Sequence, residues 1–383
     1  MKRFLQTFPA LLVAIVLSLA LAPTRALALD TQPELSEAQA AIVVDETGNV
    51  LYEKNPDEQI NMASITKIMT AVVALESGTP LDTVCTLSAP ELAENAMVAG
   101  YAAGSTSTLE DLMHVMLVYS ANDAAYEVAQ AVAGSQEAFV TKMNAKAKEL
   151  GMTGTHFENP HGLDADGHHS TVHDLAILAR YAMTTQPFIA DTVRMTEVTV
   201  NVNGSQLTFP TVDHLLGNYP GLLGIKTGAG NTVTAFMGCA RRNGTTLYTV
   251  VLGCQTVDGR FADTEALLDW AFSNYAKRTL TDGSRVLGSR PFAYDLAYSL
   301  DVSVPATLDG LTWPDEGDTS YTRVACHSDK LCTPGQTVGV CTWTQDGRCV
   351  GATSYNCQTS LKAARSGFGL VGLIGPASLD VAA

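Results

Sequence analysis

Strand-forming segments stand at both ends of a mainly helical stretch, and this order limits the folds open to the chain. Residues 41–52 predict a strand, a turn at residues 47–49 and a second strand, because apolar and β-branched residues flank a Gly-Asn pair. Helical patterns follow, and Gly and Pro punctuate them, over residues 64–77, 108–118, 123–133, 135–150 and 171–184. Strand patterns return over residues 195–201, 206–209, 222–227, 232–241 and 245–253, before a last helix at 260–277.

This arrangement predicts an α+β domain over residues 38–280. The last two strands are joined by Arg242-Asn243-Gly244, a sequence typical of a hairpin turn. Strands from both ends of the segment can pair in one sheet, and the helical middle is then an insertion between them. A chain of 383 residues has room for such a domain and for a smaller second one.

The first 28 residues have the pattern of a signal peptide. Lys2 and Arg3 precede an apolar run over residues 9–22, and Ala26-Leu27-Ala28 is a small-x-small cleavage pattern. The run is too short and too poorly flanked for a transmembrane helix, although an uncleaved N-terminal anchor is the alternative. The pattern predicts an exported, extracytoplasmic protein.

Beyond the predicted domain, residues 290–357 carry short β-like runs rich in Thr and Gly, which predict a small C-terminal β module. The tail over residues 361–383 is apolar enough to touch a membrane surface. Its four glycines and Pro376 make it a poor helix, so a packed or disordered tail is the favoured alternative.

Charge and cysteine content agree with export. Cleavage after Ala28 removes three cationic residues and no acidic one, which takes the formal net charge from −16 to −19 and disfavours nucleic acid as a partner. Five of the eight cysteines lie between residues 326 and 357. Cys341, Cys349 and Cys357 lack the C-x2-C pairs of a structural zinc site, so disulfides or free thiols are favoured.

The first motif with catalytic chemistry is Ser64-x-x-Lys67 at the start of a helical pattern. Residues three apart share a helix face, so the Lys67 amine can reach the Ser64 hydroxyl. A serine needs a base to become a nucleophile, and a lysine serves as that base when burial or nearby positive charge lowers its pKa. A capping serine followed by a surface lysine is the structural alternative.

Two further motifs follow in order. Ser120-x-Asn122 lies between two helical patterns, where Ser120 can relay a proton and the Asn122 amide can bind a substrate backbone, or where both simply belong to a capped turn. Lys226-Thr227-Gly228 closes a strand. Lys226 offers a fixed positive charge, Thr227 offers a hydroxyl for a carboxylate, and Gly228 leaves room for a ligand at the strand edge.

Together and in this order, the three motifs resemble those of the penicillin-binding proteins and serine β-lactamases. Longer phrases at residues 62–70, 120–125, 159–164 and 219–228 are similar to the low-molecular-mass D-alanyl-D-alanine carboxypeptidases. The resemblance covers residues 38–280. It implies a five-stranded antiparallel sheet flanked by helices, an all-helical subdomain, and an active site between the two.

The resemblance also implies a reaction on peptidoglycan stem peptides, without a cofactor, in which β-lactam antibiotics act as covalent inhibitors. It assigns Ser64 as nucleophile and Lys67 as general base. It assigns Ser120 and Asn122 as assisting groups, and Lys226 and Thr227 as the groups that hold the terminal carboxylate. The oxyanion hole would be the N–H groups of Ser64 and of Ala229, the residue after Gly228.

Three alternatives to a carboxypeptidase exist on the same fold. A β-lactamase is disfavoured because no Glu-x-x-Leu-Asn phrase occurs between Asn122 and Lys226. An endopeptidase or transpeptidase on the same stem peptides is the strongest rival. A non-catalytic β-lactam-sensing or wall-binding protein is disfavoured by the complete set of motif residues.

A cluster of histidines raises the question of a metal site. His161, His168, His169 and His173 lie close in sequence, but a capped helix start at residues 170–174 and the family-like phrase around His161 favour solvated turn histidines. The acidic run that begins at Asp164 lacks the later ligands of a calcium loop. We therefore expect no metal.

Overall fold

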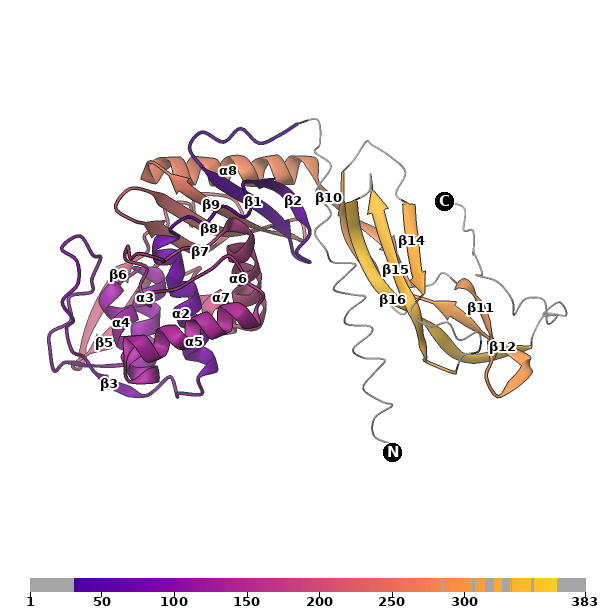
Figure 1. Ribbon diagram of the computed structural model, residues 1–383, viewed down its shortest axis with the longest axis horizontal. Helices are drawn as coiled ribbons and strands as arrows, with labels where there is room; N and C mark the ends of the chain where they lie inside the picture. The colour runs from indigo at the N-terminus through magenta and orange to yellow at the C-terminus, as the bar shows by residue number, and fades with distance from the viewer. Residues whose placement is uncertain are drawn as a thin grey trace. The chain divides into compact units, whose positions relative to one another are not determined.

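The computed structural model describes residues 31–283, 286–304, 307–313, 320–325, 331, 333–345 and 348–363 (Figure 1). The predicted signal peptide and the tail beyond residue 363 lie outside these residues. The chain divides into two compact units; the first spans Ala28–Ser273, and the second contains the strands that follow it. No helix among the described residues is long and apolar enough to cross a membrane.

A five-stranded antiparallel sheet forms the centre of the first unit, as predicted, in the order β2-β1-β9-β8-β7. Two distant pieces of the chain build it: Ile42 on β1 pairs with Val250 on β9. The strands are β1 (Ala40–Asp45), β2 (Val50–Lys54), β7 (Leu222–Ala229), β8 (Thr234–Arg242) and β9 (Thr245–Cys254). Strand β7, which carries the Lys-Thr-Gly motif, therefore lies at one edge of the sheet.

Helices cover both faces of this sheet (Figure 1). On one face lies α8, where Phe261 contacts Phe236 of β8 with ring centroids 5.5 Å apart. The next residue of β8, Met237, points into the opposite layer because side chains alternate along a strand. The helices are η1 (Ala63–Ile65), α2 (Thr66–Glu76), α3 (Leu109–Val118), α4 (Asn122–Ala133), α5 (Gln136–Glu149), α6 (Val172–Thr185), α7 (Pro187–Thr192) and α8 (Val257–Asn274).

The β8–β9 connection is the predicted hairpin. Its two loop residues, Asn243 and Gly244, have φ of 49° and 79°, which a type I′ turn requires at both positions. Two predictions were incomplete. Helix α8 ends at Asn274 rather than 277, because strand β10 begins at Ala276 and pairs with β13. The short helix α7 was missed, as was one strand pair, β3 (Val84–Thr86) with β4 (Thr106–Thr108). The predicted strands at 195–201 and 206–209 are β5 (Glu197–Val202) and β6 (Ser205–Pro210).

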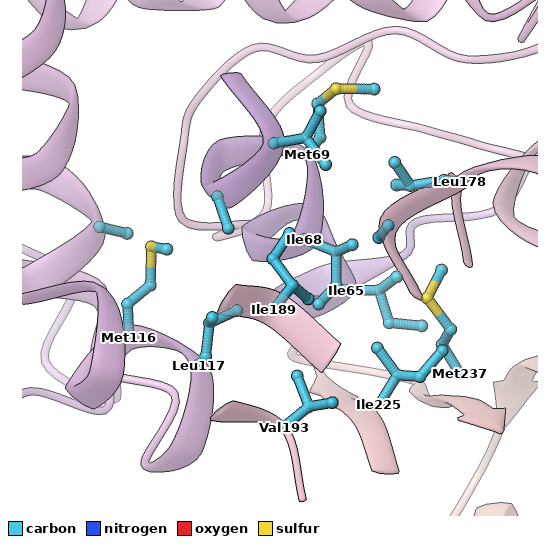
Figure 2. Packing of buried hydrophobic residues seen from close by; sticks show 14 of the residues in the cluster. Ile65, Ile68, Met69, Met116, Leu117, Leu178, Ile189, Val193, Ile225 and Met237 are labelled. Carbon is cyan, nitrogen blue, oxygen red and sulfur yellow. The ribbon is translucent and has the colours of Figure 1, made fainter. Parts of the chain in front are cut away.

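The apolar core of the first unit includes Ile65, the residue after Ser64, together with Ile68 and Met69 (Figure 2). Ile65 and Ile68 of the turn and of α2 are fully buried, and Met237 of β8 packs in the same cluster. Burying such side chains stabilises the fold by about 1.5–3 kcal/mol each. The start of α2 is thereby fixed against the sheet, which gives the residues around Ser64 a rigid base.

The second unit is all β among its described residues. It has a five-stranded sheet in the order β11-β12-β16-β15-β14 and a two-stranded sheet of β10 and β13. Cys357 is disulfide-bonded. The strands are β10 (Ala276–Thr281), β11 (Val286–Phe292), β12 (Asp295–Ser303), β13 (Leu308–Thr312), β14 (Ser320–Ala325), β15 (Thr337–Gln345) and β16 (Arg348–Ala363).

Candidate active site

A cleft of about 240 Å³ opens in the first unit, and most residues of the three motifs lie in or behind it. Its walls come from the start of α2, the α3–α4 turn, the edge strand β7 and helix α8. Five predicted site residues line it: Ser64, Ser120, Asn122, Thr227 and Ala229. Lys67 and Lys226 lie behind this lining and are buried, with 0% and 2% of their surface exposed.

The nucleophile candidate stands on a strained turn. Ala63 has φ of 47°, a left-handed conformation that side chains other than glycine rarely adopt, and its N–H donates to Asn61 Oδ1 at 2.7 Å. Gly162 packs against this turn so closely that a Cβ there would overlap the Ala63 carbonyl. The backbone of Ser64 is thus held from both sides, as is common where strain is kept at a functional site.

Lys67 is a buried amine, not a surface lysine. Its Nζ lies 2.8 Å from Ser64 Oγ, 2.7 Å from Asn122 Oδ1 and 2.6 Å from the carbonyl oxygen of His161. The alternative of a capping serine with an exposed lysine is therefore wrong, and no side-chain cap is formed at the start of α2. The His161 carbonyl was not predicted as a site group, because a backbone oxygen leaves no mark in the sequence.

The environment of Lys67 favours its neutral form. Burial lowers the pKa of this amine well below its usual value, and the positive charge of Lys226 lowers it further. A neutral amine has two N–H donors and one lone pair. The Asn122 and His161 oxygens take the two donors, so the lone pair is left for the Ser64 hydroxyl. This geometry suits proton abstraction from Ser64.

Two histidines behave differently from the prediction of solvated turn residues. His161 and His168 are buried, and burial lowers their pKa to about 3 and about 4. His168 Nδ1 accepts the Glu158 N–H at 3.0 Å, so its Nε2 carries the proton and faces Thr66 Oγ1 at 2.8 Å. Thr66 in turn donates to the Ala63 carbonyl at 2.7 Å. Among the described residues, no group of three or more His, Cys, Asp or Glu is placed to hold a metal ion.

The second motif lies on the opposite wall of the cleft. Ser120 is buried with φ of 71°, and Asn122 begins α4 with its side chain turned to Lys67 instead of to the helix end. Asp123 accepts the N–H groups of Ala99 and Gly100, each at 2.9 Å, and so anchors the loop that carries the pocket residues 93, 95 and 97. An ordinary capped turn does not account for these contacts.

Strand β7 presents alternate residues to the cleft. Thr227 and Ala229 line it, whereas Gly228 points the other way, where a Cβ would lie 2.8 Å from the Met62 carbonyl oxygen. Glycine is therefore needed here to fit the Ser64 turn, a packing reason that the sequence did not suggest. Gly230 donates to Val233 of the β7–β8 connection, so the preceding N–H, that of Ala229, points to the open sheet edge.

Two cations, Lys226 and Arg260, lie at the β7 side of the cleft, where Lys226 Nζ is 3.5 Å from Thr227 Oγ1 and Arg260 lines the cleft. Burial and, to a smaller extent, the nearby Arg260 guanidinium together lower the pKa of Lys226 to about 7. Arg260, from α8, lines the cleft and donates its Nη1 to the Gly228 carbonyl at 2.6 Å. No sequence pattern marked Arg260 as a site residue, because it lies more than thirty residues after the Lys-Thr-Gly motif and only the fold brings it there. Together the cations suit an anionic ligand group.

The cleft holds a serine next to a buried amine, two cations and a strand N–H that points to the open edge. This set of groups is suited to acyl transfer on a ligand with a terminal carboxylate. On an antiparallel sheet with a helical subdomain, it defines the class of active-site-serine peptidases. A family model described as D-alanyl-D-alanine carboxypeptidase matches residues 28–256, and the chain belongs to this family. It is accordingly a serine-type D-alanyl-D-alanine carboxypeptidase that acts on peptidoglycan, as predicted from the motifs.

Similar proteins support both units of the fold. The D-alanyl-D-alanine carboxypeptidase DacF of Bacillus subtilis is 28% identical over 379 residues, 95% of this chain and 96% of the relative. The structure of penicillin binding protein 5 from Haemophilus influenzae superposes with a TM-score of 0.74 at 22% identity, over 86% of this chain and 99% of its own. It has the same fold, including a C-terminal β half-barrel module.

A third similar protein has been seen with an antibiotic. Penicillin-Binding Protein D2 from Listeria monocytogenes, in its ampicillin-bound form, is 34% identical with a TM-score of 0.56. The match covers 63% of this chain and 100% of that protein. β-Lactams thus bind relatives of this chain, and members of the family are extracytoplasmic cell-wall enzymes.

Proposed function

We propose that Ser64 is the nucleophile of this carboxypeptidase and that Lys67 is the base that activates it. The observation that carries the proposal is the contact set of Lys67. Lys67 Nζ donates to Asn122 Oδ1 and the His161 carbonyl and lies 2.8 Å from Ser64 Oγ, so a neutral amine with both N–H groups taken would turn its lone pair to the Ser64 hydroxyl. A base placed in this way accelerates nucleophilic attack by about 10²–10⁴-fold.

In the acylation step, Ser64 Oγ attacks the carbonyl carbon of the penultimate D-alanine while its proton passes to Lys67. The negative charge that develops on the carbonyl oxygen is held by the N–H groups of Ser64 and Ala229. Lys67 then passes the proton to Ser120 as Ser120 gives its own proton to the departing amine, and the C–N bond breaks to release the terminal D-alanine. Water then hydrolyses the ester on Ser64.

Substrate orientation comes from the two ends of the cleft. Lys226, Thr227 and Arg260 hold the terminal carboxylate of the stem peptide, since a buried cation pair binds a single carboxylate strongly. The backbone of the peptide lies along the open edge of β7 as an added strand. A peptidoglycan stem peptide that ends in D-Ala-D-Ala supplies both features.

β-Lactams carry a carboxylate and a reactive amide in a similar arrangement, and we propose that they acylate Ser64. The test is intact-protein mass spectrometry after incubation with ampicillin, followed by peptide mapping. The parent should gain the mass of one ampicillin on the peptide that contains Ser64, and Ser64→Ala should gain none. An adduct on another residue, or an equal adduct on the Ser64→Ala variant, would contradict the assignment.

Export and membrane contact complete the proposal. The signal-peptide pattern at residues 1–28 supports secretion, and the apolar tail after residue 361 supports a peripheral membrane contact. Co-sedimentation of the mature protein with zwitterionic phospholipid vesicles, which do not repel its net negative charge, tests the contact by comparison with a variant that ends at residue 363. Equal sedimentation of the two would refute a role for the tail.

A further inference from the structure

An acidic side chain that the mechanism has not used lies behind the carboxylate end of the cleft. Asp213 belongs to the connection between β6 and β7, and only 8% of its surface is exposed. Its Oδ1 accepts the N–H groups of Leu215 at 2.9 Å and Leu216 at 3.3 Å. Its Oδ2 is buried and accepts no hydrogen bond from the described residues. A buried carboxylate with an unsatisfied oxygen costs free energy unless nearby positive charge offsets it.

The neighbours of Asp213 in sequence place it next to both cations. Val212 lines the cleft together with Thr227 and Arg260. On its other side, the His214 ring lies 5.2 Å from the ring of Phe261, the residue after Arg260. Asp213 is therefore held between the end of β7 and the start of α8. The Nε atom of Arg260 is likewise buried without a hydrogen-bond partner among the described residues.

The charges around Asp213 come from four elements. Burial raises the pKa of Asp213, and the charges of Lys226 on β7 and Arg260 on α8 oppose that rise. The charge of Lys226 in turn lowers the pKa of Lys67 on α2. Asp258 of α8 and Cys254 of β9 oppose the lowering of the Arg260 pKa by burial. The charge of Asp213 opposes the lowering of the Lys226 pKa. Among the acidic groups it also has the largest such effect on the pKa of Arg260.

We propose that ionised Asp213 is a positioning residue that keeps Lys226 protonated, and so keeps the cleft ready for the terminal carboxylate. This inference rests on the proposed roles of Ser64 and Lys226. Two buried cations without a counter-charge repel each other, and the lysine is the one that can lose its proton. One anion for two cations leaves a single net positive charge, which matches the single negative charge of the substrate carboxylate.

The loop contacts and the charge of Asp213 can be separated by substitution. Asp213→Asn keeps an oxygen that accepts the Leu215 and Leu216 N–H groups and removes the negative charge. An opposite charge at close range shifts a pKa by about 1–3 units, and the lower end applies because Asp213 forms no direct ion pair with the described cations. The basic limb of the kcat/KM profile, where Lys226 deprotonates, should therefore move to lower pH by about one unit.

The experiment measures D-alanine release from a diacetyl-Lys-D-Ala-D-Ala tripeptide between pH 5 and 10. The proteins compared are the parent, Asp213→Asn and the control Asp269→Asn. The control removes an exposed carboxylate from α8, the helix that also carries Arg260. We expect the basic limb to move to lower pH by about one unit in Asp213→Asn alone. At pH values above the limb this shift lowers kcat/KM roughly tenfold, mainly through a higher KM. Below the limb, activity should return to near the parent value.

A uniform loss at every pH, or an unmoved basic limb, would overturn the proposal and leave Asp213 a loop-stabilising residue. A shift of equal size in Asp269→Asn would also overturn it. If Asp213→Asn does not fold, Asp213→Ser carries the same test, because its hydroxyl still accepts from the loop. Failure of the proposed function is distinguishable, because the parent itself would then release no D-alanine.

Discussion

Replacing Gly162 by alanine should disable the enzyme without removing any catalytic atom. Gly162 has φ of +86°, and an added Cβ would overlap the carbonyl of Ala63 and lie 2.9 Å from the Ser64 nitrogen. Both neighbours are backbone atoms, so no flexible side chain can move aside. The Ala63 carbonyl would have to retreat by about 1 Å to reach the 3.0 Å below which Cβ contacts are essentially never found.

That displacement fixes the expected size of the effect. The Ala63 carbonyl precedes the Ser64 N–H, so moving it shifts both the nucleophile and one oxyanion donor. A misplacement of about 1 Å in a catalytic group costs on the order of 100-fold in rate. The left-handed backbone and the overlap together should also lower the free energy of unfolding, by about 2–4 kcal/mol.

The assay is the second-order rate constant for acylation by a fluorescent penicillin, measured with the melting temperature of each variant. Gly134→Ala is the matched control: Gly134 has φ of +75°, but nothing lies within 4 Å of its added Cβ. It should lose about 1 kcal/mol of stability and keep its acylation rate. A Gly162→Ala variant that acylates at the parent rate would refute the idea that this contact fixes the Ser64 turn.

Two further perturbations test other parts of the site and fold. Arg260→Ala should raise KM for the tripeptide by about 10–100-fold with a smaller change in kcat, because it removes a charge-assisted contact to the substrate carboxylate. Arg242 lies outside the cleft lining, so Arg242→Ala is the control. A KM of Arg260→Ala equal to that of the control would contradict the role. The Asp263 carboxylate accepts the N–H groups of residues 36, 37 and 38, which help to hold its pKa below its usual value despite partial burial. Its stabilising effect is full above the unfolded-state pKa and is lost as pH falls through the folded-state pKa. Asp263→Asn should therefore lower the melting temperature at pH 7, and the melting temperatures of variant and parent should converge at low pH. A constant difference across the whole pH range would refute that linkage.

The sequence identified the parts of this site that consist of side chains in short motifs. Ser64 and Lys67 could be placed on one helix face from their spacing, and the hairpin at Asn243-Gly244 from its turn chemistry. That the two ends of the segment share one sheet followed from the strands that stand on either side of its helical middle. Each of these rests on local rules that do not need the tertiary structure.

What could not be predicted depends on contacts between distant segments. Arg260 and Asp213 reach the cleft only because α8 and the β6–β7 connection pack beside β7. The burial of His161 and His168 depends on how their loop folds over the Ser64 turn, and a histidine-rich loop looks solvated when read alone. The packing of Gly228 against the Ser64 turn could not be predicted for the same reason, because strand register decides which side of β7 faces the turn.

The most direct test is D-alanine release from the diacetyl-Lys-D-Ala-D-Ala tripeptide by purified mature protein and its Ser64→Ala variant, with both shown to be folded by their melting curves. Release by the parent and none above background by the variant is the predicted result. Release by both would contradict Ser64 as the nucleophile. Release by neither would contradict the assigned reaction on simple stem peptides.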